Sequence, residues 1–390
     1  MSTLHITLVG EQPEPIYYVI NELKPDAVVY VCSKQTESKA KAIQELACIE
    51  KHATVIIDPT DANEISNCAD YIAEEFSGYD TTLNISGGSK PWAYIFGIKF
   101  GTMPNATVLF LDQNNVLWNY KTMTGTTINY KFDILTALKL RGHQMSQYHD
   151  FSCYVQKDIE TMRKIERARN FNHQAFTNLM SVLEKEKQTK IKKGTEGIFY
   201  LQQKGHEADN NNYVQWFKPS KDNPDGLVRI NLVSKKGDRK EEFETASPHA
   251  IDLAFNSGWF EFKIARMIAQ WDKVQKIYMN CIFPFDSHID KNEIDIIVET
   301  DKKAIFVECK TQITKPSDID KFRSAVKNYG GTSTTGLFIS EGKLGSDIKA
   351  KCADNSLQCF SLNDYRGNTS NAEQALIDLL EHIYQTINTR

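Results

Sequence analysis

Three features are scarce in this 390-residue sequence: long apolar runs, paired cysteines and an excess of charge of one sign. No run approaches the roughly 18 apolar residues of a membrane-spanning helix. The first residues, MSTLHITLVG, lack the basic and apolar regions of a signal peptide. We therefore expect a cytoplasmic protein without membrane contact.

The eight cysteines stand singly, with no C-x-x-C pair, which argues against a disulfide framework and against a zinc site. We expect them to be small buried side chains in a reducing compartment. The formal net charge of -4 and the pI near 6.2 exclude an overall basic coat, so any contact with nucleic acid must be local.

The length predicts two or three domains, and 41% hydrophobic with 25% charged residues is typical of folded globular proteins. Residues 1–134 alternate β-branched runs with helical patterns, which predicts a Rossmann-like domain with a parallel sheet. Residues 135–240 are polar, helical and then β-rich, and we interpret them as a connector. Residues 241–390 return to a mixed pattern that predicts an α/β core with a central hairpin.

The stretch AIFVECKT, residues 304–311, is an apolar strand that ends in two charged residues, Glu308 and Lys310. Residues two apart in a strand share a face, and a hairpin turn can bring Asp295 of the preceding strand alongside Glu308. Two carboxylates this close repel each other unless a cation fills the site. Mg²⁺ and Mn²⁺ prefer such oxygen ligands and lower the pKa of bound water.

The competing interpretation makes Glu308 and Lys310 a simple ion pair at a strand end. A helix upstream carries Glu261, in GWFEFKIARMIAQW, although that carboxylate also fits a solvated helix face. The order of helical Glu, strand Asp and acidic-x-Lys resembles the PD-(D/E)XK nuclease superfamily, with Ile294 in place of the usual Pro. We expect Glu293 to face solvent or to support the ligands rather than to bind metal.

Other polar residues give weaker signals. We treat His206, His249 and His288 as non-catalytic because none stands near complementary ligands in the sequence. Several basic residues lie near the hairpin in the sequence. They could contact the phosphate backbone of a nucleic acid or equally well be part of an ordinary solvated surface. They are Lys302, Lys303, Lys321, Arg323 and Lys327.

A second motif, LNISGGSKPW at residues 83–92, ends an apolar strand with paired glycines and hydroxyls before a helix. Glycines let a backbone approach a ligand, and a helix N-terminus favours anions, so the loop is typical of a phosphate cradle. Neither the Walker A spacing nor G-x-G-x-x-G is present, so ATP or NAD binding is not implied. The loops at 10–15 and 33–38 should lie on the same rim, unless they are simple β-to-α turns.

An Asn-x-Ser-Gly-Gly-Ser-Lys loop on a Rossmann-like domain, followed by a PD-(D/E)XK core, resembles the CARF-domain nucleases, which are ancillary effectors of type III CRISPR immunity. The resemblance implies a homodimer that binds one cyclic oligoadenylate, usually cyclic tetra-adenylate, and thereby activates a nuclease dependent on Mn²⁺ or Mg²⁺. It implies ligand contacts from residues of the three loops: Gly10, Glu11, Gln12, Ser33, Thr36, Asn84, Ser86, Gly87, Gly88, Ser89 and Lys90.

The same resemblance implies a nuclease centre made by Glu261, Asp295, Glu308 and Lys310. Asp295 and Glu308 would hold the metal, Glu261 would assist through water, and Lys310 would position the nucleophile. The implied role is antiviral defence by cleavage of DNA, RNA or both.

Three other functions fit parts of the sequence. One is a nucleotide-sensing transcription regulator with an inactive nuclease fold, and another is a nuclease whose first domain only dimerises. The third is cleavage of the bound oligoadenylate by the N-terminal domain, for which Lys90 is a candidate. The sequence leaves open the ring size of the activator, the metal, and the choice among single-stranded DNA, duplex DNA and RNA.

Overall fold

The computed structural model describes residues 2–181, 191, 193–201, 209–255, 257–284, 292–311, 315–331, 334–365 and 368–386. The chain divides into two compact units, one extending to Gln144 and the other covering Met145–Thr386. Each is described by itself. Within the described residues, no helix is both long enough and apolar enough to cross a membrane.

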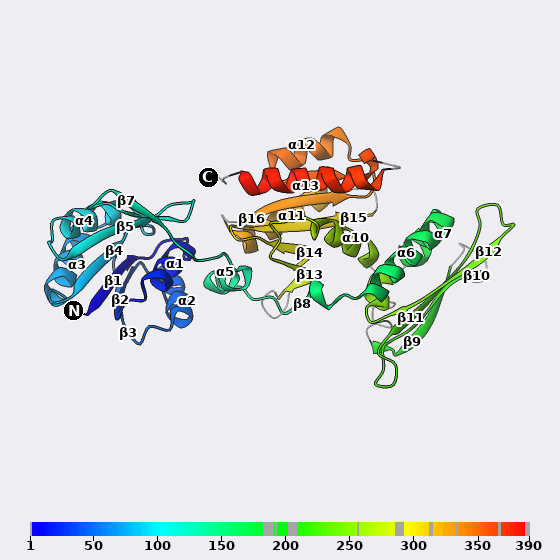
Figure 1. Ribbon diagram of the computed structural model, residues 1–390, viewed down its shortest axis with the longest axis horizontal. Coiled ribbons are helices and arrows are strands. Elements are labelled where there is room, and N and C mark those ends of the chain that lie inside the picture. The colour runs from blue at the N-terminus through cyan, green and yellow to red at the C-terminus, as the bar shows by residue number, and fades with distance from the viewer. Residues whose placement is uncertain are drawn as a thin grey trace. The chain divides into compact units, whose positions relative to one another are not determined.

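The first unit is built on one seven-stranded sheet with the order β3-β2-β1-β4-β5-β6-β7 (Figure 1). Strands β1 to β5 are parallel, and β6 and β7 add an antiparallel hairpin at one edge. The strands are β1 (Thr3–Leu8), β2 (Ala27–Cys32), β3 (Lys51–Ile56), β4 (Asp80–Asn84), β5 (Ala106–Leu111), β6 (Val116–Asn119) and β7 (Thr124–Thr127). The strand order reverses between β1 and β4, which is the place where such sheets bind ligands.

Helices cover both faces of this sheet, as β-branched strands buried on two sides require. The helices are α1 (Glu14–Leu23), α2 (Glu37–Ala47), α3 (Ala62–Glu75), α4 (Lys90–Gly101) and α5 (Ile134–Leu140). Apolar residues of α1, α2 and α5 form one core with β2, while those of α3 and α4 form another on the opposite face. The expected Rossmann-like fold is confirmed.

The second unit contains a six-stranded mixed sheet with the order β17-β16-β15-β14-β13-β8. Its strands are β8 (Gln147–Asp150), β13 (Lys276–Phe283), β14 (Asn292–Glu299), β15 (Ala304–Lys310), β16 (Thr334–Ser340) and β17 (Gln358–Ser361). Strands β14 and β15 form the expected hairpin, and β16 runs parallel to β15. The predicted α/β core is therefore present.

Helices pack on both faces of this core. Helix α10 (Gly258–Ile268) contacts β13, β14, β15 and α13 (Thr369–Gln385), whereas α11 (Pro316–Ala325) contacts β14, β16 and α12 (Ser346–Asp354). One turn of π-helix, Val326–Gly330, continues α11. Short 3-10 helices lie at Phe151–Cys153 and Leu362–Tyr365.

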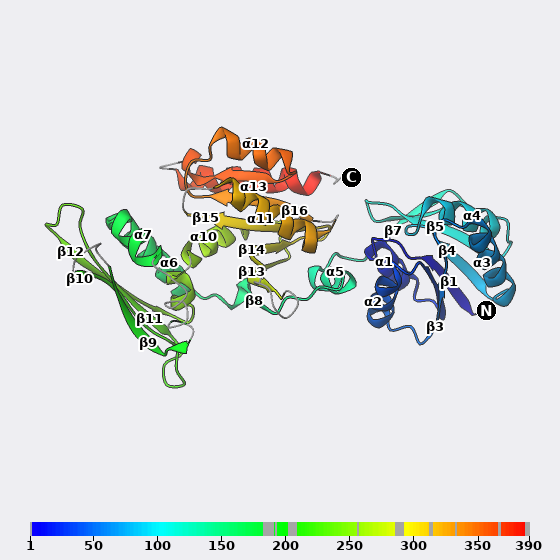
Figure 2. The ribbon, with the colours of Figure 1, turned by 180° about the vertical axis from the view of Figure 1, so that it is seen from behind.

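The same unit carries a four-stranded antiparallel sheet, here called the wing, made by β9 (Glu196–Leu201), β10 (Asp209–Phe217), β11 (Gly226–Val233) and β12 (Lys240–Ser247). Helices α6 (Gln156–Phe171), α7 (His173–Ser181) and α9 (Ala250–Ala254) contact one face of the wing. Among the described elements, no helix lies on the other face (Figures 1 and 2). The wing and the mixed sheet share one apolar core.

Two strands differ from the sequence-based expectation. KEEFETAS follows the stretch expected to be β-rich, yet it forms the fourth wing strand, β12, whose polar residues alternate with buried Phe243 and Thr245. Strand β8 lies in a stretch expected to be helical, and it forms one edge of the mixed sheet by pairing with β13. Tertiary pairing outweighs local pattern in both cases.

Candidate functional site

The loops after β1 and β4 meet at the strand-order switch of the first unit. A Cβ added at Gly10 would lie 2.7 Å from the nitrogen of Gly88, and one added at Gly87 would lie 2.3 Å from the carbonyl oxygen of Leu8. Gly88 has φ +74°, which a residue with a side chain rarely adopts. The three glycines thus let the two loops pack backbone against backbone.

The polar side chains of the loop after β4 are mostly engaged within the first unit. Asn84 is fully buried, and its Oδ1 accepts a hydrogen bond from the Ser86 backbone N–H at 2.9 Å. The Ser86 hydroxyl accepts from the Leu111 N–H at 2.7 Å, and Ser89 caps α4. These contacts hold the loop at the edge of the sheet, where the first turn of α4 begins.

The loop after β2 is fastened to β1 in a similar way. The Thr36 hydroxyl donates to the carbonyl of Val9 at 3.0 Å and accepts from the Ser33 N–H at 3.0 Å. Both residues are buried. Ser33 and Thr36 therefore stabilise the loop conformation, because their hydroxyls form hydrogen bonds within the protein.

Of the loop residues that the resemblance singles out, three have exposed side chains: Glu11, Gln12 and Lys90. Glu11 forms an ion pair with Lys39 of α2, a residue that the sequence motifs do not single out. Lys90 opens α4, so its ammonium group and the helix N-terminus both favour an anion at this rim. The loops thus combine closely packed backbone with exposed polar side chains.

The second cluster lies where β14 and β15 separate. The hairpin register pairs Ile296 with Val307, so the next pair along is Asp295 and Glu308. An Asp295 carboxylate oxygen accepts from the Cys309 backbone N–H at 2.7 Å. The structure therefore brings the two carboxylates together as the sequence predicts.

Glu261, near the start of α10, joins these carboxylates, and its side chain is buried rather than solvated. Burial and the negative charges of Asp295, Glu293 and Glu308 raise the pKa of Glu261 well above its usual range. Burial and Glu308 do the same for the pKa of Asp295. This concentration of buried acid marks a functional site because it is unfavourable without a compensating cation.

Lys310 supplies part of that compensation through an ion pair with Glu308. Burial disfavours the charge on Lys310, but Glu308 and Asp295 outweigh it and raise the pKa of the ammonium group. Burial is also the largest cause that raises the pKa of Glu308, while Lys310 opposes it. At neutral pH the lysine is therefore a fixed positive charge beside two carboxylates.

No three Asp, Glu, His or Cys side chains converge on one metal position within the described ranges. Glu261, Asp295 and Glu308 are thus coupled electrostatically without forming a ready three-ligand shell. The donor chemistry nevertheless fits Mg²⁺ or Mn²⁺, because Mg²⁺ is commonly held by one or two carboxylates with water and substrate phosphate. Asp295 and Glu308 are the two carboxylates that could hold such an ion.

Two further acidic residues belong to this neighbourhood. Glu293 is exposed and raises the pKa of Glu261, Asp295 and Glu308. Asp318, in the first turn of α11, acts on both Glu308 and Lys310. Glu293 could be noticed in the sequence because it lies two residues from Asp295, whereas no sequence pattern pointed to Asp318.

The two basic residues of the hairpin turn contact the end of α13. Lys303 is buried, and its ammonium group donates to the carbonyls of Ile383 at 3.0 Å and Thr386 at 2.6 Å, so it is not available to a phosphate. Lys302 is exposed and lies over the ring of Tyr384. Lys321, Arg323 and Lys327 are exposed as well.

His249 binds the buried carboxylate of Asp158 through Nδ1 at 3.0 Å, while His206 and His288 lie outside the described residues. The cysteines are free. The expectation that all eight are buried is wrong for Cys48 and Cys153, which are exposed.

No family model and no curated protein matches the sequence. Solved structures do match its fold. Can2 from Sulfobacillus thermosulfidooxidans, in complex with cyclic tetra-adenylate, is 16% identical, with a TM-score of 0.68 and 100% of each chain covered. Protein VC1899 from Vibrio cholerae is 13% identical, with a TM-score of 0.70 over 97% of this chain and 98% of that one.

A third match is a type III CRISPR defence DNA nuclease activated by cyclic oligoadenylate, 15% identical with a TM-score of 0.52. It covers 96% of this chain but 52% of the nuclease. At these identities the likeness concerns the fold. The chain thus shares the fold of these proteins, and the expected order of a Rossmann-like domain followed by an α/β core is confirmed.

Proposed function

We propose that this protein is a metal-dependent nuclease that a cyclic oligoadenylate, in the first place cyclic tetra-adenylate, switches on during type III CRISPR antiviral defence. The observation that carries the proposal is the cluster of Glu261, Asp295, Glu308 and Lys310, in which Glu261 is buried and the other three are half-buried. A strand-end ion pair alone would not require two more carboxylates beside it.

The first unit supports the sensing role. The glycine-packed loops place the N-terminus of α4 and the exposed Lys90 at the strand-order switch, where a polyanion would be favoured. Can2, which has the same fold, is solved with cyclic tetra-adenylate. We propose that Gly10, Gln12, Lys90 and the loop backbone contact the nucleotide, while Asn84, Ser33 and Thr36 hold the loops in shape.

In the nuclease centre we assign Asp295 and Glu308 to the metal, which would supply a Lewis acid and a nucleophilic hydroxide at neutral pH. Glu261 would support that site through water. Lys310, held by Glu308, would place a positive charge beside the phosphate that gains negative charge during cleavage. The nucleic acid is DNA, RNA or both.

We also propose a homodimer formed through α4. Most side chains of this helix are apolar, including those that face solvent. On its exposed side, Tyr94 is 70% exposed and Ile98 is 54% exposed. An added Cβ at Gly97 or Gly101 would meet no atom within 4 Å, so the same side is open. A two-fold pair through α4 would bring two copies of the Lys90 loop together around one symmetric ligand.

The decisive experiment measures cleavage of labelled single-stranded DNA, RNA and supercoiled plasmid with Mn²⁺, with and without cyclic tetra-adenylate. We expect cleavage only when metal and nucleotide are both present, and a loss of about 10²-fold or more in Glu308→Gln and Lys310→Ala. Lys276→Ala, an exposed lysine at the start of β13 in the same unit, is the matched control and should stay active. Equal cleavage with and without the nucleotide would refute the proposed activation.

A sensor with an inactive nuclease fold is the second candidate. It is favoured by the absence, among the described residues, of three side chains preassembled around a metal. Nucleotide-induced thermal stabilisation without cleavage of any substrate would establish it.

A further inference from the structure

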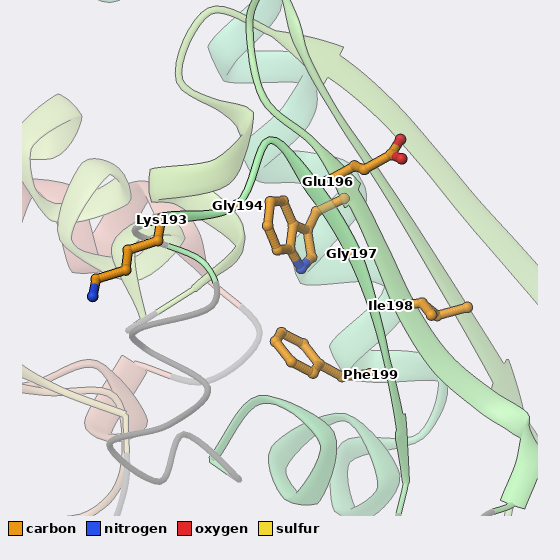
Figure 3. Close-up of a pocket in the computed structure, with 7 residues that line it drawn as sticks. Lys193, Gly194, Glu196, Gly197, Ile198 and Phe199 are labelled. Carbon is orange, nitrogen blue, oxygen red and sulfur yellow. The ribbon is translucent and has the colours of Figure 1, made fainter.

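The wing has a cavity of about 390 Å³, but its aromatic side chains already have partners within the protein (Figure 3). Trp216 is 1% exposed and packs on Gly197, and the Phe199 ring lies edge-on to Phe255. Among the residues that the structure describes, this cavity therefore presents no free ring face to a ligand. A pair of thiols on the mixed sheet of the same unit has chemistry that the proposed function does not use.

The two thiols lie where α12 meets β17, the edge strand of the mixed sheet. Cys352 belongs to α12 and is fully buried, whereas Cys359 belongs to β17 and is half-buried. The Cys352 thiol donates a hydrogen bond to the sulfur of Cys359. The two sulfur atoms are thus in contact, and Cys359 is the one that is partly accessible to solvent.

The end of α12 brings the backbone of the two cysteines together. The helix ends in a Schellman motif, in which the Leu357 N–H donates to the carbonyl of Cys352 at 2.9 Å. The Ser356 N–H donates to the carbonyl of Ala353, also at 2.9 Å, and Ser356 has the left-handed φ of +56° that the motif needs. The chain therefore turns back directly after α12, and Cys359 follows two residues after Leu357.

The strand register turns the Cys359 side chain toward the helices. Cys359 pairs directly with Phe338 of β16, so the two side chains share one face of the sheet. The ring centroid of Phe338 lies 6.3 Å from that of Phe322 in α11, and α11 packs against α12. Cys359 therefore lies on the helix-covered face, where α12 brings in Cys352.

The two cysteines differ in acidity in the way that a redox-active thiol pair requires. The hydrogen bond from Cys352, with the positive charge of Lys349, outweighs burial and lowers the pKa of Cys359 to about 7. The same hydrogen bond and burial raise the pKa of Cys352. At neutral pH a large part of Cys359 is therefore thiolate, which is the form that reacts with oxidants, and Cys352 is a protonated thiol beside it.

We propose that Cys359 and Cys352 form a site of reversible oxidation whose substrate is a hydroperoxide, in the simplest case hydrogen peroxide. The Cys359 sulfur attacks a peroxide oxygen, the O–O bond breaks and hydroxide leaves, which gives a sulfenic acid at Cys359. The Cys352 sulfur then attacks Cys359 Sγ, the S–O bond breaks and water leaves with the Cys352 proton. Two electrons pass from the thiols to the peroxide, and the products are one disulfide and two water molecules.

This site goes beyond the proposed nuclease function and does not depend on it. The disulfide would join α12 covalently to the edge strand β17. In reducing compartments such bonds are transient and respond to oxidants, and a thiol reductant restores the free cysteines.

The test exposes the reduced, full-length protein to hydrogen peroxide, alkylates the remaining thiols and analyses tryptic peptides by mass spectrometry. One tryptic peptide, residues 352–366, contains both cysteines. We expect this peptide to lose two hydrogen atoms in mass, to escape alkylation and to be restored by dithiothreitol. Its oxidation should be about tenfold or more faster than that of the exposed Cys48 and Cys153.

Two variants separate the roles of the two thiols. Cys352→Ser keeps the reactive thiol but removes the second one, so a sulfenic acid should persist at Cys359 and react with dimedone. Cys359→Ser should abolish the fast oxidation of the peptide. Cys153→Ser is the matched control, because it removes an exposed thiol and should leave the oxidation unchanged. Thermal melting reports whether each variant remains folded.

The proposal is overturned if peptide 352–366 of the wild-type protein stays fully alkylated while Cys48 or Cys153 is oxidised, an outcome that needs no variant. It is also overturned if Cys352 is oxidised at the wild-type rate in Cys359→Ser, or if the only disulfides formed join two molecules. A protein that forms the internal disulfide but cleaves no nucleic acid would refute the nuclease function alone.

Discussion

At the scale of single residues, the glycines of the sensing loops act mainly through close packing of backbone. Gly87 lies against the carbonyl of Leu8, and Gly88 needs its positive φ. Both requirements come from the meeting of two loops that are far apart in the sequence. Backbone contacts within the first unit therefore fix the shape of the proposed ligand loops.

This packing predicts that Gly87→Ala lowers the free energy of unfolding of the first unit by about 1–3 kcal/mol, because the new methyl group overlaps backbone. It should also weaken cyclic tetra-adenylate binding. Gly78→Ala is the control, since a Cβ there meets nothing within 4 Å. Urea denaturation and calorimetric titration measure the two effects, and equal stability of both variants would contradict the role given to Gly87.

His5, on β1, makes the stability of the first unit depend on pH. Its ring is fully buried, Nδ1 lies 2.8 Å from the Thr82 hydroxyl, and burial lowers the pKa of His5 to about 3. The folded state keeps the ring neutral, whereas the unfolded chain protonates it below a pKa of about 6.5. The stabilisation is therefore complete above about pH 6.5 and is lost as the pH falls toward 3.

We expect His5→Asn to be less stable than wild type at pH 8 but to lose less stability between pH 6.5 and 4. Over that interval a single such histidine changes the free energy of unfolding by up to about 1.4 kcal/mol per pH unit. Denaturant titrations at several pH values measure the slope. An identical slope in both proteins would exclude His5 as its source.

At the scale of elements, α6 is fastened to the end of β16 beside the nuclease centre. Arg169 of α6 forms an ion pair with Glu341 and lies 5.3 Å over the ring of Trp259 in α10. The Glu341 backbone N–H donates to the carbonyl of Lys310 at 2.9 Å. We infer that Arg169 and Glu341 position the backbone that carries Lys310.

A double-mutant cycle tests this link between α6 and β16. Arg169→Gln and Glu341→Gln should each reduce kcat several-fold and leave KM nearly unchanged. The fold-loss of kcat in the double variant should be smaller than the product of the two single losses, which corresponds to a coupling free energy of about 1 kcal/mol. The control pair is the exposed salt bridge of Lys349 and Asp364. Fully additive effects on kcat would show that the two residues act independently.

At the scale of the whole molecule, the proposed assembly through α4 would decide whether two copies of the Lys90 loop can share one ligand. Tyr94→Arg and Ile98→Arg place charges in the proposed two-fold interface, which should convert the dimer to a monomer. Light scattering measures the mass. Cyclic tetra-adenylate affinity should fall at least tenfold with the loss of the second half-site.

Met123→Arg is the control for that experiment, because Met123 is 73% exposed and lies outside α4. It should keep the mass and affinity of the wild type. Unchanged mass in the α4 variants would place any dimer contact elsewhere. Monomers that still bind the nucleotide tightly would contradict a shared site.

The sequence by itself determined most strands and helices and the main acidic pair. An apolar run predicted β15, and the short turn to the preceding strand predicted that Asp295 lies near the end of β15, where it accepts the Cys309 N–H. The Asn-x-Ser-Gly-Gly-Ser-Lys loop likewise follows a strand and opens a helix as its pattern indicates.

Only the tertiary structure decided how the remaining polar groups are used. Lys303 has the sequence features of a phosphate contact, yet α13, about 80 residues away in the sequence, buries it. The Thr36 hydroxyl turns inward because the carbonyl of Val9, just after β1, offers an acceptor, and Trp216 packs closely on the neighbouring strand because Gly197 has no side chain. Each outcome depends on contacts between distant segments, and local sequence patterns carry no information about such contacts.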